Sequence, residues 1–130
     1  MSTYRFTYYW LPVLVYCAAI FIQSSFPTTE HLPQWPHLDK ILHVAAYALL
    51  GFLFFRGLAT GRLADNHNIA LILSILFAGL YGISDEIHQS FVPGRSAEAV
   101  DALADLVGGF LGAGVGWLRF KQIDKSADLL

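Results

Sequence analysis

The stretch Tyr81–Gly116 reads YGISDEIHQSFVPGRSAEAVDALADLVGGFLGAGVG, and it decides how the rest of the chain is interpreted. An apolar run ends there in a polar segment that contains the adjacent acids Asp85 and Glu86. After a short turn, a second apolar run begins with further acids and continues into glycine-spaced residues. A charge at the end of a membrane helix is ordinary, but this concentration of acids between two apolar runs predicts a site with its own chemistry.

The composition of the chain indicates a membrane protein. Of its 130 residues, 55% are hydrophobic and 14% are charged, whereas a soluble domain averages about 45–50% apolar and roughly 25% charged residues. The net charge of -2 offers no basic surface for nucleic acid. The single cysteine, Cys17, excludes an internal disulfide.

Four apolar runs predict four membrane-spanning helices, because a span needs roughly 20 residues to cross a hydrocarbon core of about 30 Å. We predict an all-α, integral-membrane four-helix bundle, a single domain over 1–130 with helices at about 8–26, 39–58, 68–89 and 97–119. A soluble bundle needs one apolar face per helix, but these runs are apolar nearly all round. The residues from 121 to 130 are expected to form a solvated tail.

The first run has an alternative interpretation as a cleaved signal peptide. Its basic segment is a single residue, Arg5, and no A-x-A cleavage site follows, so we favour an uncleaved helix.

The distribution of basic residues predicts that both termini are cytoplasmic. In this N-in, C-in arrangement six of the eight Lys and Arg residues lie inside, and only Lys40 and Arg95 lie outside. Seven of the ten acids then lie outside. We therefore expect a multi-pass protein of the cytoplasmic membrane, with its polar cluster at the extracytoplasmic face.

The second predicted helix places Asp39, His43 and Tyr47 on one face, because they are four residues apart. An ionisable residue inside a span, such as His43, is a functional candidate by default. The alternative is a neutral histidine that bonds to the backbone or to Asp39. The helix dipole also favours an acid at the position of Asp39.

The acids at the end of the third predicted helix need a compensating cation, because the helix dipole disfavours negative charge there. The candidates are Arg95, Lys40 and a bound metal ion. Pro93 and Gly94 predict a type II turn, which would direct Arg95 back toward the acids. Ser96 is then the expected N-cap of the fourth helix.

The fourth predicted helix brings Asp101, Asp105, Gly108, Gly112 and Gly116 close to one face. Glycines at this spacing allow close helix packing, so both acids should point into the bundle. Two carboxylates one turn apart in a poorly hydrated site repel each other, which calls for a proton or a cation between them. The same glycine face could instead mediate a homo-oligomer.

These patterns define the candidate site. The predicted catalytic residues are Asp85, Glu86, His88, Asp101 and Asp105, and the predicted substrate-binding residues are Lys40, Tyr47, Gln89 and Arg95. The predicted ligands of a divalent metal ion are Asp39, His43, His88 and Asp101. Mixed carboxylate and imidazole ligands suit zinc, manganese or iron, although no single spacing is a strong metal motif.

These residues resemble the VanZ-like family of membrane proteins over about residues 21–116. The resemblance rests on Ser24-Ser25, on Asp39-Lys40 with His43 and Tyr47, on the block Ser84 to Gln89, on Phe91 to Arg95, and on Asp101, Asp105 and Gly108. Asp105 is a mild departure, because the family commonly has Asn at or just before this position. The family shares its name with a protein associated with teicoplanin resistance. That association implies a role at the outer face of the cytoplasmic membrane, near lipid-linked cell-wall precursors, but it implies no reaction.

Three functions remain open from the sequence. The first is an enzyme, a metal-assisted hydrolase or transferase, that acts on a lipid-linked or phosphate-bearing envelope substrate. The second is a module without catalysis, which binds a lipid headgroup or couples proton movement to lipid handling. The third is a structural role, in which the polar cluster only fixes the register of the helices. This role does not explain why four acids occur together, namely Asp85, Glu86, Asp101 and Asp105.

Overall fold

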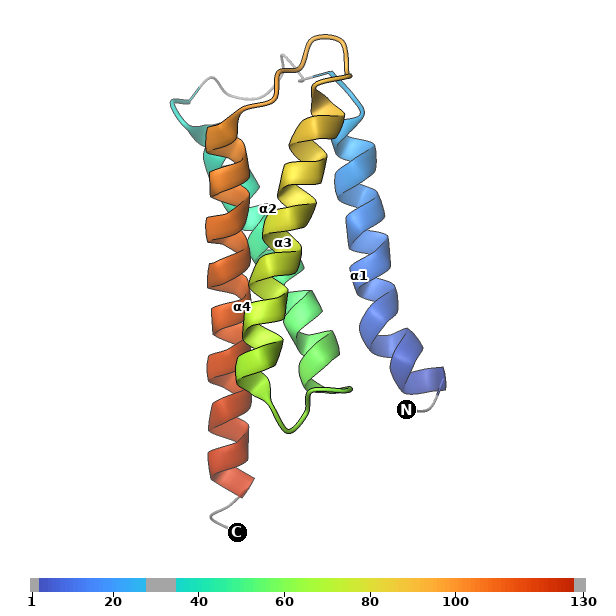
Figure 1. Ribbon diagram of the computed structural model, residues 1–130, viewed down its shortest axis with the longest axis vertical. Coiled ribbons are helices and arrows are strands. Elements are labelled where there is room, and N and C mark those ends of the chain that lie inside the picture. The colour runs from blue at the N-terminus through green and yellow to red at the C-terminus, as the bar shows by residue number, and fades with distance from the viewer. Residues whose placement is uncertain (1–2, 28–34, 128–130) are drawn as a thin grey trace.

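The computed structural model describes residues 3–27 and 35–127, and every regular element in these ranges is an α-helix. The helices are α1 (Thr3–Ser24), α2 (Leu38–Ala59), α3 (His67–Gln89) and α4 (Ala99–Ala127). Each is long and apolar enough to span a membrane. They run alternately up and down beside one another (Figure 1), which confirms the predicted all-α four-helix bundle.

Two helices extend further than the apolar runs indicated. α1 begins at Thr3 rather than near residue 8, and it contains Pro12. α4 ends at Ala127 rather than near residue 119, so the expected tail is helical as far as Ala127, although its last residues are exposed. Lys, Gln and Ala are good helix formers, so the helix continues after the apolar pattern has stopped.

The glycines of α4 form the contact with α2. A Cβ added at Gly112 would overlap the backbone of Ala48, and one added at Gly116 would meet the ring of Phe55. Gly108 is buried on the same face. Close approach of this kind favours association of helices in a membrane. The predicted inward orientation of the glycines is confirmed, and within this chain their face is occupied by α2.

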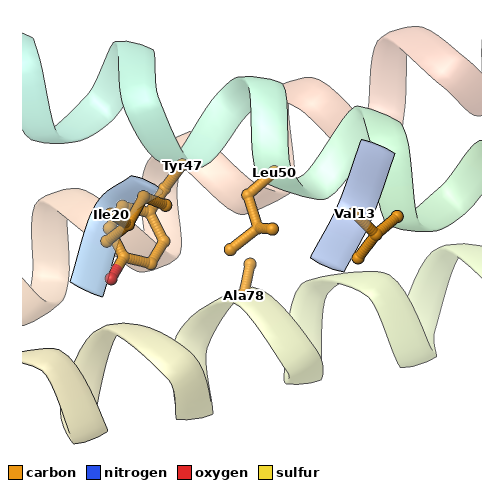
Figure 2. Packing of buried hydrophobic residues seen from close by; sticks show 5 residues of the cluster. All are labelled: Val13, Ile20, Tyr47, Leu50 and Ala78. Atoms are coloured by element: carbon orange, nitrogen blue, oxygen red, sulfur yellow. The ribbon is translucent and has the colours of Figure 1, made fainter. Parts of the chain in front are cut away.

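The core between the helices is narrow, and most large apolar side chains point outward. One buried cluster contains Val13 and Ile20 of α1, Tyr47 and Leu50 of α2, and Ala78 of α3. Figure 2 shows Leu50 pointing across toward Ala78. In contrast, Leu14 and Leu80 are more than 60% exposed. This distribution is expected for a chain whose outer surface meets lipid rather than water.

The connections of the bundle divide it into two unlike ends. The end of α1, the start of α2, the end of α3 and the start of α4 lie together, and we call this the polar end. The two ends of the chain lie at the opposite end (Figure 1). The acids of the Tyr81–Gly116 stretch are therefore grouped at the polar end, away from both termini.

Candidate functional site

A histidine and an aspartate form a buried hydrogen bond between α2 and α4 at the polar end. His43 Nδ1 and Asp105 Oδ1 are 2.8 Å apart, and Asp105 has no exposed surface. On α3, a Cβ added at Gly82 would lie 2.7 Å from Asp105 Oδ2. The absent side chain at Gly82 therefore makes the room that the carboxylate occupies, and three helices together fix its position.

Glu86 of α3 joins this pair and also connects α3 to α4. Its Oε2 accepts a hydrogen bond from the backbone N–H of Glu98, just before α4, at 2.8 Å. Its Oε1 is buried and has no hydrogen-bond partner among the described residues, and the same is true of Asp105 Oδ2. The predicted N-cap, Ser96, lies before the start of α4 at Ala99. That prediction was wrong, because the Glu86 carboxylate serves the free N–H at this helix start.

His43, Glu86 and Asp105 form one group, which we call the buried triad. Each offers one ligand atom, and these atoms lie within 4.8 Å of one another. Two carboxylates and an imidazole can hold Zn²⁺ or Mn²⁺. A carboxylate in such a group can also accept a proton from water. The triad is therefore the part of the site that is best placed for chemistry.

Lys40 of α2 is the cation that compensates the neighbouring acids. Its Nζ lies 2.8 Å from Asp39 Oδ2 and 2.7 Å from Glu98 Oε2, and it also contacts Asp101 Oδ1. Asp101 Oδ2 is in turn 3.9 Å from His43 Nε2. A continuous series of contacts thus leads from two acids on the exposed rim, through Lys40 and Asp101, to the triad.

Three further residues of the predicted site are buried near the triad: Asp85 and Gln89 on α3, and Tyr47 on α2. Gln89 Nε2 donates to Asp85 Oδ2 at 3.0 Å, and both side chains are buried. Tyr47, one turn after His43, is 1% exposed, and its hydroxyl has no hydrogen-bond partner among the described residues. Asp85 and Gln89 are therefore hydrogen-bonded to each other, whereas the O–H of Tyr47 has no acceptor among the described residues.

His88 lies against α1 rather than in the triad. Its Nε2 is 2.9 Å from Ser25 Oγ, and its ring stacks on Phe21 with the ring centroids 4.4 Å apart. Because His88 follows Glu86 by two residues, it points about 200° around the helix from it. Asp39, another predicted metal ligand, is exposed and bonded to Lys40. Of the four predicted ligands, the structure thus places His43 in the triad and Asp101 beside it.

Arg95 does not face the acids. The predicted type II turn is present, with Gly94 at φ 80° and the Arg95 N–H bonded to the Val92 carbonyl at 3.1 Å. The guanidinium instead donates to the carbonyls of Phe26 at 3.3 Å and Gln23 at 3.5 Å. The expected direction of Arg95 was wrong, because carbonyls at the end of α1 are left without helical partners and accept from it.

Sequence reasoning missed the roles of two residues. Ser25 pairs with His88, and Glu98 both bonds to Lys40 and donates its N–H to Glu86. Spacing could not indicate the first pairing, because Ser25, directly after α1, is 63 residues from His88 on α3. The Ser24-Ser25 pair was the available signal, since two hydroxyls close an otherwise apolar run.

A model of the VanZ/LLP1 family matches residues 3–120, which include the whole triad and all of its contacts described above. No curated protein and no solved structure matches the chain.

Proposed function

We propose that this protein, which belongs to the VanZ/LLP1 family, is a membrane enzyme that acts on a phosphate-bearing lipid of the cell envelope, such as a lipid-linked cell-wall precursor. The observation that carries the proposal is the buried triad, which is connected to Lys40 through Asp101. Hydrolysis of the substrate, or transfer of its phosphate-bearing group, is the reaction that such a site supports.

The depth of the triad fits a lipid headgroup. Phe26, Trp35 and Phe91 lie around the polar end and are 61%, 70% and 80% exposed. Aromatic side chains at the ends of apolar helices are typical of the membrane–water interface. The triad lies one to two turns inside this level, so a lipid held among the helices would bring its headgroup to it.

Lys40 is the group that would hold the phosphate. Two of its three partners are exchangeable, because the side chains of Asp39 and Glu98 are 62% and 49% exposed. Exposed ion pairs contribute only about 0–1 kcal/mol each, so an anionic phosphate can displace them. Asp101, whose side chain is 10% exposed, would stay in contact with Lys40 and keep it beside the triad.

The chemical step follows from the free carboxylate oxygens. A carboxylate of the triad takes a proton from water, and the water oxygen forms a bond to phosphorus. The P–O bond to the leaving group breaks, and the proton that the carboxylate took passes to the leaving oxygen, directly or through water, which restores the carboxylate. Glu86 is the expected base, because its Oε1 is unpartnered among the described residues.

The proposal includes an orientation, in which both termini are cytoplasmic and the polar end faces outward in the cytoplasmic membrane. Its support is the excess of Lys and Arg at the end opposite the triad. With Cys17 replaced by serine, a membrane-impermeant thiol reagent should label Ala97→Cys on intact cells and should not label Arg62→Cys. The reverse pattern would place the site in the cytoplasm.

The function is tested with purified protein in vesicles that contain a polyprenyl diphosphate or phosphatidylglycerol. We expect the wild type to convert one of these lipids, with products identified by mass spectrometry. Glu86→Gln should slow conversion about 100-fold or more, the typical contribution of a general base. His67→Gln is the matched control, because His67 pairs with Asp124 at the opposite end of the bundle. Equal rates in the wild type and Glu86→Gln would overturn the assignment.

A second candidate, a proton-handling module that binds lipid without catalysis, is favoured by a different observation. Both cations predicted to hold an anion are already engaged, Lys40 with three acids and Arg95 with two carbonyls. Buried acids without partners are typical of proton relays. Lipid binding without conversion in the same vesicles would select this candidate.

A further inference from the structure

We infer that His43, Glu86 and Asp105 bind a divalent transition-metal ion, Zn²⁺ or Mn²⁺. The inference deepens the proposed function. A bound ion would take Glu86 Oε1 as a ligand, and the ion would then activate the water in place of the free carboxylate. The argument and the test of the inference do not require catalysis. The ligand set differs from the one that spacing predicted, because the structure brings in Glu86 and Asp105 and leaves out His88 and Asp39.

The distances within the triad are close to those of a coordination sphere. With metal–ligand bonds of about 2.0–2.2 Å, two ligand atoms on one ion are at most about 4.4 Å apart. The triad atoms lie within 4.8 Å of one another, and His43 Nδ1 and Asp105 Oδ1 are already 2.8 Å apart. Small side-chain rotations suffice to close the group around an ion.

Two buried oxygen atoms point to a missing partner. Glu86 is 5% exposed and Asp105 is fully buried, yet Glu86 Oε1 and Asp105 Oδ2 have no hydrogen-bond partner in the described ranges. Burying a carboxylate oxygen without a partner is unfavourable. A cation between these atoms would satisfy both, whereas a purely structural contact would leave them unused.

The local charge balance favours a divalent ion. Within residues 3–27 and 35–127, no Lys or Arg forms an ion pair with Glu86 or Asp105. Lys40 is taken up by Asp39, Glu98 and Asp101. Two carboxylates and a neutral imidazole carry two negative charges, which one divalent ion neutralises.

The donor atoms decide the class of ion. A site of two oxygens and one imidazole nitrogen suits zinc or manganese, whereas magnesium and calcium prefer oxygen alone. A group with only three protein ligands leaves coordination positions for water or a substrate oxygen, as in catalytic metal sites.

The test measures binding of Zn²⁺ and Mn²⁺ to the full chain in detergent after treatment with a chelator. We expect one ion per chain by elemental analysis, and a rise in the thermal midpoint when the ion is added, because a ligand that binds only the folded state stabilises it. For Mn²⁺, pulsed electron paramagnetic resonance should show coupling to an imidazole nitrogen that disappears in His43→Gln.

The variants separate the triad from its neighbours. Glu86→Gln and Asp105→Asn should each weaken binding at least tenfold, while His88→Gln and Asp39→Asn should bind as the wild type does. Helical circular dichroism identifies variants that fail to fold, and the remaining triad variant then decides. No stoichiometric ion in a folded wild type, or binding that survives Glu86→Gln and Asp105→Asn, would overturn the inference. Because no lipid is used, this result is independent of whether the protein converts lipid.

Discussion

At the scale of single residues, the site depends on which carboxylate oxygens have partners. Asp85 is satisfied by Gln89, and Asp101 by Lys40, so each has a structural explanation. Glu86 and Asp105 each use one oxygen in a hydrogen bond and leave the other buried and unpartnered among the described residues. Asp85 and Asp101 are therefore held by neighbouring side chains. Glu86 and Asp105 each keep one carboxylate oxygen available for a ligand.

The contribution of the His43–Asp105 hydrogen bond to stability can be measured with a double-mutant cycle. Asp105→Ala leaves the buried imidazole without its acceptor and should lower the free energy of unfolding by about 1–3 kcal/mol. Asp105→Asn keeps an oxygen acceptor and should cost less. The measurement is reversible unfolding in detergent with chelator present, repeated in a His43→Ala background, where the cost of Asp105→Ala should shrink. An unchanged cost there would show that the two side chains do not stabilise each other.

At the scale of helices, the site depends on the close approach of α2 and α4. Gly112 lies against the backbone of Ala48, and this contact sets the distance at which His43 on α2 reaches Asp105 on α4. Gly114, on the same helix, has open space where a Cβ would lie. The two glycines therefore provide a matched pair for testing the packing.

We expect Gly112→Ala to lower the free energy of unfolding by about 1–3 kcal/mol, because an added methyl group forces the helices apart. Gly114→Ala should be neutral or stabilising by up to about 1 kcal/mol, since alanine is the better helix former. Equal effects of the two substitutions on detergent unfolding would contradict the packing described here.

The helices also show what the sequence could and could not predict. Hydrophobic length predicts four spans, and the four-residue spacing of Asp101, Asp105 and the glycines predicts their inward face, because packing and polarity coincide there. In contrast, α3 is apolar nearly all round before Ser84, so periodicity could not show that His88 turns toward α1. Arg95 was misplaced for a similar reason, since the turn type fixes the backbone but not the partner of a long side chain.

At the scale of the whole molecule, the two ends of the bundle differ in composition. Both ends carry exposed aromatic side chains, but the polar end holds the triad and Lys40, while the opposite end holds the start of α1, the end of α4 and most of the basic residues. Between them the interior is narrow, and many of its buried residues are small, such as Gly51, Ala78 and Gly112. Under the proposed function, a ligand would therefore enter at the polar end, from the headgroup region of the membrane.

We propose that the buried triad exists for function rather than for stability. The most direct test is the free energy of unfolding of Glu86→Gln against the wild type, in detergent with chelator present. A glutamine keeps the acceptor for the Glu98 N–H, and its amide can donate to the free oxygen of Asp105. We expect the variant to be more stable by about 1 kcal/mol or more, because a buried carboxylate with one unpartnered oxygen is replaced by a neutral amide. A loss of stability of that size would instead make the triad a structural element that fixes the helices in register.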